Sequence, residues 1–183
     1  MSDLSNSLMI DGGGAVLVAA LGPVGMVTVK ADFTDKNLAA RVAKTLGVAL
    51  PKPRRINKGV AWMAPDELLV FTQKGVDPDT LATKIDAALG HAGLALNVSD
   101  SRAVFALKGE GAREVLAKGA PVDLATSAFG QGSFRRTRLG QVAVAFWMEA
   151  EDEFRLVCFT SMREFMFDWL VNAAQKDSLP GHL

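Results

Sequence analysis

The sequence predicts an α+β fold of two lobes, each an open sheet covered by helices. Two similar runs carry this prediction, WMAPDELLVFT at 62–72 and WMEAEDEFRLVCFT at 147–160. Both read as a strand, an acidic turn and a strand that ends in Phe-Thr, and a helical pattern follows each. Self-similarity of this kind indicates duplication. Because a sheet with one apolar face must bury it against another element, each copy should form a layered lobe.

The composition is that of a folded globular protein. The chain has 183 residues, enough for two small lobes, of which 49% are hydrophobic and 22% are charged. Its 20 basic residues balance its 20 acidic ones, so no net charge attracts nucleic acid or anionic lipid. The apolar stretch at 15–29 is too short to span a bilayer, the start lacks a signal-peptide pattern, and a lone Cys158 cannot form an internal disulfide. We therefore expect a cytoplasmic protein that binds neither nucleic acid nor membrane.

The first lobe is expected over 15–93, after a flexible arm over 1–14. Apolar runs bounded by glycine and proline predict its strands, and apolar residues at helical spacing predict its helices. The expected helix caps are Thr34 or Asp35 for the first helix and Asp77 or Asp79 for the second. The elements in chain order are strands at 16–21 and 26–30, a helix at 37–46, strands at 59–63 and 68–72, and a helix at 78–91.

The second lobe is expected over 94–175, before a loose tail over 176–183. Its final helix should begin after Ser161 and bury Phe165, Trp169 and Leu170. The elements in chain order are strands at 94–99 and 103–108, a helix at 112–118, an irregular segment at 123–132, a long strand at 136–147, a strand at 154–160 and the final helix to about 174.

The sequence offers no convincing catalytic, cofactor-binding or metal-binding set. His91 and His182 are the two histidines, and neither has a Cys, Asp or Glu at ligand spacing. The Gly-Glu-Gly run at 109–111 lacks the third glycine of a dinucleotide fingerprint, because Glu114 stands in its place. We interpret this run as a tight strand-to-helix turn. Cys158 lies between apolar residues and is expected to be a buried structural thiol.

Two basic clusters remain as candidate binding surfaces. Either could bind RNA or a folate polyglutamate tail, but no aromatic residues interleave with the first and the second begins a strand, which sends alternate side chains to opposite faces. Arginine is favoured at protein interfaces because its planar fork binds carboxylates. The second cluster is therefore the candidate partner interface, with internal pairing to the acidic residues at 149–153 as the alternative. The first cluster holds Lys52, Arg54, Arg55 and Lys58, and the second holds Arg135, Arg136 and Arg138.

The central part of the chain resembles a known family. The run NVSDSRAVFALKGEGAREVLAKGAPVDL at 97–124 is similar to the signature of the sarcosine oxidase gamma subunit family. Later blocks resemble the same family in the same order: FGQG at 129–132, TRL at 137–139 and FDWL at 167–170. The likeness spans about residues 60–172. More distantly, the run is similar to the aminomethyltransferase and folate-binding superfamily, which implies two ferredoxin-like lobes.

The resemblance implies a non-catalytic gamma subunit of heterotetrameric sarcosine oxidase, with alpha, beta and delta subunits as partners. Such a complex oxidatively demethylates sarcosine to glycine and passes the one-carbon unit to tetrahydrofolate. The resemblance places no cofactor in this chain: NAD and tetrahydrofolate belong to alpha, FAD to beta, FMN between them, and zinc to delta. A stand-alone folate-dependent, aminomethyltransferase-like protein is the alternative, although no folate-holding carboxylate can be matched. An RNA-binding accessory that uses the Arg135 cluster is a third hypothesis.

Overall fold

The computed structural model describes residues 7–11 and 13–181. By contact these residues form two compact units. One is a single stretch, Val24–Ser99, which we call the continuous unit. The other combines the chain up to Pro23 with the chain from Asp100 onward, and we call it the split unit.

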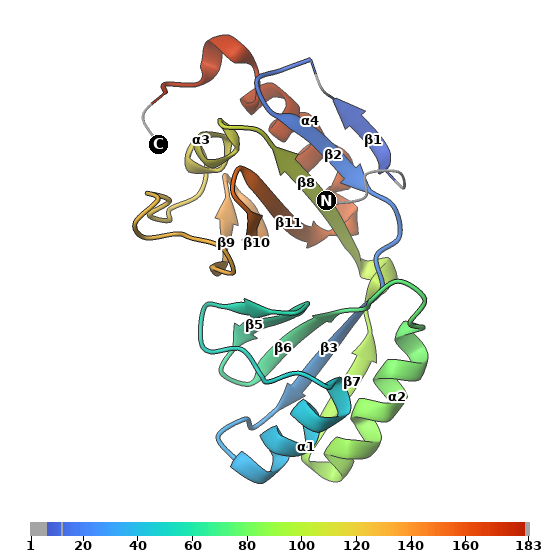
Figure 1. Cartoon of the computed structure of the whole chain (residues 1–183). Coiled ribbons are helices and arrows are strands. Elements are labelled where there is room, and N and C mark those ends of the chain that lie inside the picture. The colour runs from blue at the N-terminus through green and yellow to red at the C-terminus, as the bar shows by residue number, and fades with distance from the viewer. Residues whose placement is uncertain (1–6, 12, 182–183) are drawn as a thin grey trace. The chain divides into compact units, whose positions relative to one another are not determined.

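The continuous unit is a five-stranded antiparallel sheet in the order β4-β5-β6-β3-β7. Helices α1 and α2 lie side by side against it (Figure 1). This is a ferredoxin-like βαββαβ arrangement to which the short edge strand β4 has been added. Its elements are β3 (Met26–Ala31), α1 (Lys36–Leu46), β4 (Ile56–Asn57), β5 (Val60–Ala64), β6 (Glu67–Phe71), α2 (Pro78–Leu89), the 3-10 turn η1 (Gly90–Ala92) and β7 (Gly93–Asn97).

Local capping signals explain where the two helices of the continuous unit begin and end. The Asp35 carboxylate accepts hydrogen bonds from the backbone N–H groups of Asn37 and Leu38, and Asp77 accepts one from that of Thr80. Gly47 ends α1 in the left-handed conformation, with φ of 67°. Asp35 and Asp77 are therefore the true caps among the expected pairs.

The split unit is a six-stranded antiparallel sheet in the order β1-β2-β8-β11-β10-β9. Helices α3 and α4 supply apolar residues to the core on one of its faces. Its elements are β1 (Ser7–Asp11), β2 (Leu17–Leu21), β8 (Arg102–Lys108), α3 (Ala112–Ala117), β9 (Phe134–Leu139), β10 (Val142–Ala150), β11 (Glu153–Phe159), the 3-10 turn η3 (Thr160–Met162), α4 (Arg163–Ala173) and the 3-10 turn η4 (Lys176–Ser178).

The two sheets repeat one topology, which confirms the predicted α+β fold of duplicated ferredoxin-like lobes. The order β9-β10-β11-β8-β2 in the split unit matches β4-β5-β6-β3-β7 in the continuous one. The difference lies in the last strand, because the described residues after α4, up to residue 181, include no strand and β2 from an earlier part of the chain takes that place. A hydrogen bond of 2.9 Å from the Ala15 N–H to the Ala174 carbonyl joins the start of this strand to the end of α4.

This permutation changes the lobe boundaries from those that the sequence predicts. The strand expected at 16–21 was assigned to a lobe over 15–93, but it pairs with β8 in the split unit. The unit boundaries fall at Pro23/Val24 and Ser99/Asp100 instead of at 93/94. The physical reason is that the backbone groups of the central strand β8 need hydrogen-bond partners on both sides. Strand β11 supplies the partners on one side, and β2 supplies those on the other.

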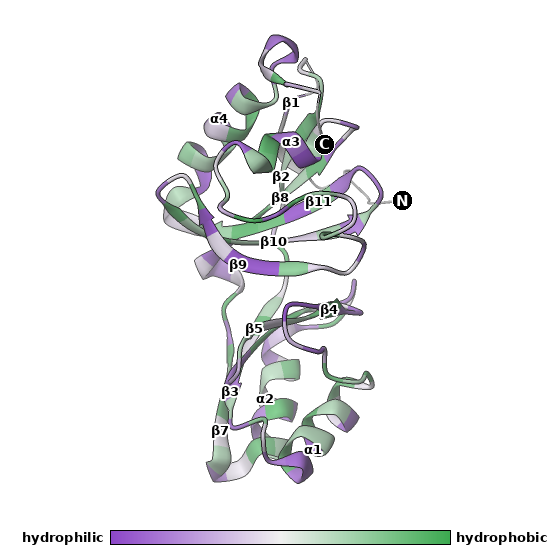
Figure 2. Cartoon of the chain, turned by 90° about the vertical axis from the view of Figure 1, so that its left-hand side faces the viewer, coloured by the Kyte–Doolittle hydropathy of each residue, from purple (hydrophilic) through white to green (hydrophobic). Residues whose placement is uncertain are grey.

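The long strand expected at 136–147 is a hairpin. Strands β9 and β10 pair from Leu139 opposite Val142, so residues 140 and 141 form a two-residue turn. Gly140 takes a φ of 58° at the first turn position, where glycine is favoured. The hairpin makes β9 an edge strand, and Figure 2 shows a hydrophilic stretch along it.

The ends of the chain are more ordered than the expected arm and tail. Within the arm predicted over 1–14, residues 7–11 form β1 beside β2, while residues 1–6 and 12 lie outside the described residues. In the tail, the Gly181 N–H donates to Glu114 Oε2 at 2.9 Å. Lys118 Nζ donates to Ser178 Oγ at 2.7 Å, and Leu179 packs on the core. Residues 176–181 therefore lie against α3.

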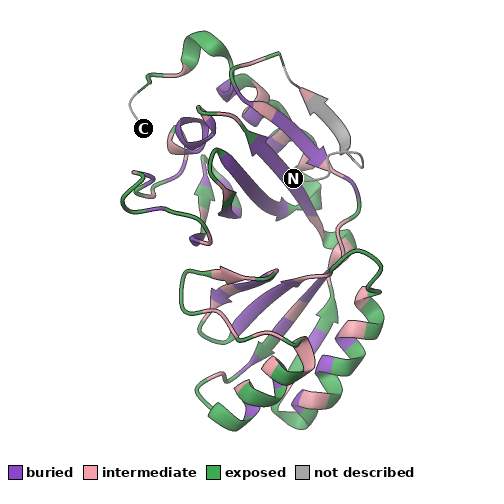
Figure 3. Ribbon diagram, in the orientation of Figure 1, coloured by how far each residue is buried: buried purple, intermediate pink, exposed green. Residues whose placement is uncertain are grey.

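Each unit has an apolar core between its sheet and its helices. Figure 3 shows the buried strands β8 and β11 and helix α3 of the split unit. Helix α4 buries Met166, Leu170 and Ala173, which lie at i, i+4 and i+7 on one face. The expected face was wrong at Phe165, which is 56% exposed, while Trp169 is half-buried against the core.

Candidate functional site

The three candidate arginines lie on the edge strand β9 and divide between its two faces. Arg136 and Arg138 are exposed on one face, opposite Ala145 and Ala143 of β10. Arg135 lies on the helix-covered face, where its guanidinium carbon is 5.4 Å from the Phe129 ring centroid. The predicted alternation of this strand is therefore confirmed, and two of the three charges point outward together.

Two of the acidic residues that were the alternative partners of these arginines, Glu149 and Glu153, have contacts with other residues. Glu149 accepts a hydrogen bond of 2.7 Å from the indole N–H of Trp147. Glu153 forms a buried ion pair of 2.8 Å with Arg155 on the same strand. The side chain of Arg138 makes no hydrogen bond or ion pair with any other described residue. Its charge therefore remains available to a partner.

Arg113 is the residue that the sequence analysis missed, and it binds the irregular segment that precedes β9. It is 7% exposed, and Nη1 donates to the carbonyl oxygens of Leu124 at 2.6 Å and Phe129 at 2.9 Å. Its guanidinium also lies 5.4 Å from the Phe154 ring centroid. A buried guanidinium is stable where several acceptors surround it. Arg113 thus holds the part of the irregular segment between Leu124 and Phe129. The guanidinium group of Arg135 lies over the Phe129 ring.

The sequence contained one signal that could have found Arg113. In the α3 sequence AREVLA an arginine stands among apolar residues on a helix whose residues 112–116 are all buried. An arginine that is buried must have acceptors, and in the structure the irregular segment that follows supplies two of them.

The first basic cluster lies in the loop before β5 of the continuous unit. Lys52, Arg54, Arg55 and Lys58 are all exposed there, and the hydrogen bond of 2.8 Å from Asn57 Nδ2 to the Ala49 carbonyl holds this loop. No aromatic side chain interleaves with these basic residues in the sequence. In the sequence, the cluster therefore does not show the alternation of basic and aromatic residues that is typical of single-stranded nucleic acid binding.

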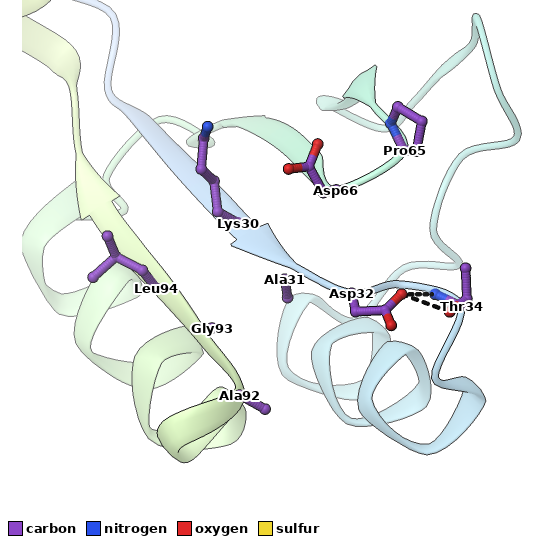
Figure 4. A pocket seen from close by; sticks show the side chains of 9 residues that line it. All are labelled: Lys30, Ala31, Asp32, Thr34, Pro65, Asp66, Ala92, Gly93 and Leu94. Carbon is purple, nitrogen blue, oxygen red and sulfur yellow. Dashed lines mark hydrogen bonds between the residues drawn. The ribbon is translucent and has the colours of Figure 1, made fainter.

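An open hollow of about 480 Å³ lies at one end of the sheet in the continuous unit (Figure 4). Lys30, Asp32 and Asp66 are the charged residues that line it. Asp32 accepts hydrogen bonds of 2.6 Å from the Thr34 hydroxyl and 2.9 Å from the Thr34 N–H, and these bonds hold the pKa of its carboxyl below the ordinary value. The Asp32 carboxylate thus stabilises a local turn, and the lining includes neither a histidine nor a cysteine.

The remaining groups that the sequence analysis considered are the Gly-Glu-Gly run and the two histidines. Residues 109–111 form the tight turn between β8 and α3, as predicted, with the Ala112 N–H donating to the Gly109 carbonyl at 2.9 Å. His91 is exposed in η1, and His182 lies outside the described residues. Within residues 7–11 and 13–181, no three His, Cys, Asp or Glu side chains gather as a metal site would require. No helix in the same ranges has the length and apolar character needed to cross a membrane.

Cys158 is buried in β11, as predicted, and its Sγ lies 3.3 Å from the Phe159 carbonyl oxygen. Burial raises the pKa of this thiol to about 11, although the charges of Arg102 and Arg163 oppose the shift. The thiolate, which is the reactive form, is therefore scarce at neutral pH.

We expect a thiol reagent at pH 8 to label native Cys158 roughly 100-fold or more slowly than the denatured chain, because its raised pKa and its burial both limit reaction. The native rate should rise with pH up to about 11, where half of the thiol would be ionised. Cys158→Ser should lower the free energy of unfolding by about 1–3 kcal/mol, because the buried hydroxyl group would lack good hydrogen-bond partners. Fast native labelling whose rate already levels off near pH 8.5–9, about where an ordinary thiol is ionised, would show that the thiol is exposed.

Comparisons with known proteins agree on one relationship. The sequence matches the sarcosine oxidase, gamma subunit family over residues 30–176. "Sarcosine oxidase subunit gamma" of an Arthrobacter species is 30% identical over 174 residues, 91% of this chain and 84% of that protein.

Solved structures give the same result for the fold. A chain of heterotetrameric sarcosine oxidase from Corynebacterium sp. U-96, solved in complex with pyrrole 2-carboxylate, is similar with a TM-score of 0.81 and 26% identity. That match covers 98% of this chain and 92% of that one. Aminomethyltransferase T of the glycine cleavage system from Bartonella henselae gives a TM-score of 0.57 at 14% identity, covering 83% of this chain and 44% of that one. The second match supports a likeness of fold alone.

Proposed function

The chain belongs to the sarcosine oxidase gamma subunit family, and from this premise we propose that it is a non-catalytic subunit that supports assembly of a heterotetrameric sarcosine oxidase. The observation that carries the proposal is the match to one chain of such an enzyme over nearly the whole length of both chains. A chain that shares the fold of that subunit over nearly its whole length is expected to serve the assembly in the same way.

The proposed role is to cover surface that larger subunits would otherwise expose. Binding of any partner to the folded state stabilises that state by mass action, so the subunit would raise the stability of the complex. We assign the chemistry to the alpha, beta and delta subunits, with FAD, FMN, NAD, tetrahydrofolate and zinc held there. In that assembly sarcosine is oxidatively demethylated to glycine and the one-carbon unit passes to tetrahydrofolate. The lone buried Cys158 suits a reducing cytoplasm.

The function is tested by comparing the chain alone with the chain co-expressed with its partner subunits. Alone, it should be colourless and should not oxidise sarcosine. Co-expressed, it should co-purify with a flavin-containing complex that does. Stoichiometric flavin, turnover, or tight tetrahydrofolate binding by the isolated chain would contradict the proposal and favour the stand-alone folate-dependent protein.

We propose Arg136 and Arg138 as polar contacts of the subunit interface, and Arg135 as a residue that supports them from the core side. Changing Arg136 and Arg138 together to Ala should leave the melting temperature within about 2–4 °C of the wild type, because exposed side chains contribute little to stability. The same change should weaken association about tenfold or more, because arginine anchors dominate many interfaces. Size-exclusion chromatography of the co-expressed chains measures the loss.

Arg135→Ala is the matched comparison, since it removes the contact with the Phe129 ring. It should lower the melting temperature of the isolated chain more than the double change does. Normal assembly of the Arg136/Arg138 double variant would show that neither residue is an important contact of the interface.

A further inference from the structure

The continuous unit contains a small apolar pocket, which we call the socket. It has a volume of about 150 Å³, and its lining comes from the end of α1, strands β5 and β6, and α2 with the loop before it. Seven of its ten lining residues are apolar. Among them Val60 and Val70 belong to the buried core, whereas Val76 is 42% exposed. The socket therefore leads from the surface of the unit to the edge of its core.

The size of the socket indicates what it can hold. Sites for cofactors and drug-sized ligands usually measure about 300–1,000 Å³. The socket, at about 150 Å³, is smaller than these sites and suits a single large apolar side chain. Protein interfaces commonly depend on such an anchor, in which one side chain of a partner enters a pocket and is cleared of water. The socket therefore fits an anchoring side chain of a protein partner better than a whole cofactor.

Lys58 is the charged residue of the lining, and a strained turn sets its position. Strands β4 and β5 pair from Asn57 opposite Val60, so Lys58 and Gly59 form a two-residue hairpin turn. Their φ angles are 45° and 82°, and a type I′ turn requires positive values at both positions. Asparagine or glycine suits the first position, whereas lysine is strained there. A strained residue beside an open pocket indicates a role beyond folding.

The segment that carries Lys58 is basic. Residues 46–60 supply four members of the lining and hold four basic residues with no acidic one. No acidic residue occurs anywhere from residue 36 to residue 65. The four basic residues are the first basic cluster of the sequence, which had no other assigned role. An acidic partner would therefore be attracted to this segment.

The side chain of Lys58 makes no hydrogen bond or ion pair with any other described residue. The nearest acidic residues in the sequence of the other lining segment are engaged elsewhere. Asp77 accepts a hydrogen bond of 2.8 Å from the Thr80 N–H, and Asp79 accepts one of 3.0 Å from the Asn97 side chain. A partner that covered Lys58 would remove water from its ammonium group, which is stable there when a carboxylate binds it.

A second copy of this chain does not fit the socket. A two-fold contact brings the same patch of both copies together, so a socket would face a socket. Neither copy would then supply an anchoring side chain, and the two Lys58 charges would repel each other.

We propose that the socket docks an acidic segment of another subunit of the assembly, which inserts one apolar side chain and places a carboxylate on Lys58. This inference rests on the proposed function, since it names a surface by which the subunit joins its complex. It does not depend on the contact proposed for β9, which belongs to the split unit.

The test uses the complete complex, with all subunits co-expressed and this chain carrying the tag. Val76→Asp should reduce partner affinity at least about tenfold, because it places a carboxylate where the anchor enters. Leu94→Asp is the matched control, since Leu94 is 47% exposed in the same unit but does not line the socket. It should change affinity less than about twofold. Dilution of the tagged complex, followed by chromatography, measures both, and melting of each isolated variant checks its fold.

Lys58 tests the charge of the partner. Lys58→Glu keeps a strained side chain in the turn, so the isolated chain should melt within about 2 °C of the wild type, but association should weaken at least about tenfold. Lys58→Asn suits the turn, so it should raise the melting temperature by about 2–4 °C and still weaken association about threefold or more. Higher stability together with lower affinity is a result that a purely structural lysine would not give.

Four results would count against these ideas. Wild-type affinity of Lys58→Glu would overturn the acidic partner. Wild-type affinity of Val76→Asp, in a complex that does assemble, would overturn the docking site. Loss of self-association or of bound nucleic acid by these variants, with normal binding of the other subunits, would likewise contradict it. Failure of the wild-type chain to bring down any partner would instead refute the proposed function.

Discussion

Replacing Arg113 with Leu is expected to lower the free energy of unfolding by about 2–4 kcal/mol, because two buried carbonyl oxygens would lose their donor. These are the carbonyl groups of Leu124 and Phe129, at 2.6 and 2.9 Å from Nη1. Leucine is shorter than arginine and cannot donate a hydrogen bond, so the two oxygens would remain buried without this partner. Urea denaturation followed by linear extrapolation measures the change.

Arg41→Leu is the matched control for this prediction. Arg41 also donates to a backbone carbonyl, that of Ala88 at 3.0 Å, but it is exposed on α1. Water can replace the lost hydrogen bond there, so the cost should stay within about 0.5 kcal/mol. Equal losses for the two variants would show that burial does not distinguish Arg113. A loss confined to Arg113→Leu, with faster amide exchange in residues 120–133, would show that this side chain orders the segment before β9.

Features that depend on neighbouring residues could be predicted from the sequence. Asp35 and Asp77 were among the expected helix caps, because a cap is recognised by the first turn that follows it. The Gly-Glu-Gly turn at 109–111 follows from the same kind of local signal. The duplication was visible because both copies keep the strand–turn–strand pattern. The caps and the turn each depend on one short stretch of chain, and the duplication is seen by comparing two such stretches.

The pairing of β2 could not be predicted in the same way. Its sequence LVAAL would suit the edge of either sheet, and continuity along the chain favoured the first lobe. The structure pairs it with β8, far along the chain, because the split unit has no strand after α4. Permutation of this kind leaves no local trace, since the same strand fills the same position in the sheet whichever end of the unit supplies it.

The buried face of α4 and the hairpin of β9 and β10 are two further features that the sequence prediction missed. Helix α4 has apolar side chains around much of its circumference, and the position of the sheet decides that Met166 is buried and Phe165 is not. The hairpin of β9 and β10 turns on Gly140 followed by a glutamine, a weaker signal than Asn-Gly. The acceptors of Arg113 were also hidden, because backbone carbonyl groups of an irregular segment carry no sequence signature.

Gly93→Ala is expected to cost about 2–3 kcal/mol, because the added methyl group would overlap the ladder between β7 and β3. A Cβ atom at this position would lie 2.5 Å from the Lys30 carbonyl oxygen and 2.9 Å from the Ala31 Cβ. The backbone of Gly93 is extended, with φ of 179°, so any residue could adopt it and the cost would come from crowding alone. The Lys30 oxygen belongs to the paired strand β3 and cannot withdraw without disturbing that pairing.

Two other glycines separate crowding from backbone strain. A Cβ at Gly130 meets nothing within 4 Å and its φ is not in the left-handed region, so Gly130→Ala should stay within about 0.5 kcal/mol of the wild type. Gly47 also has open space but a φ of 67°, so Gly47→Ala should cost about 1 kcal/mol through strain. Urea denaturation of the three variants should therefore rank Gly93 first, Gly47 second and Gly130 last. If Gly93→Ala lowered the free energy of unfolding as little as Gly130→Ala, this outcome would contradict the close pairing of β7 with β3. The two strands would then have to lie farther apart at Gly93, the first residue of the edge strand β7.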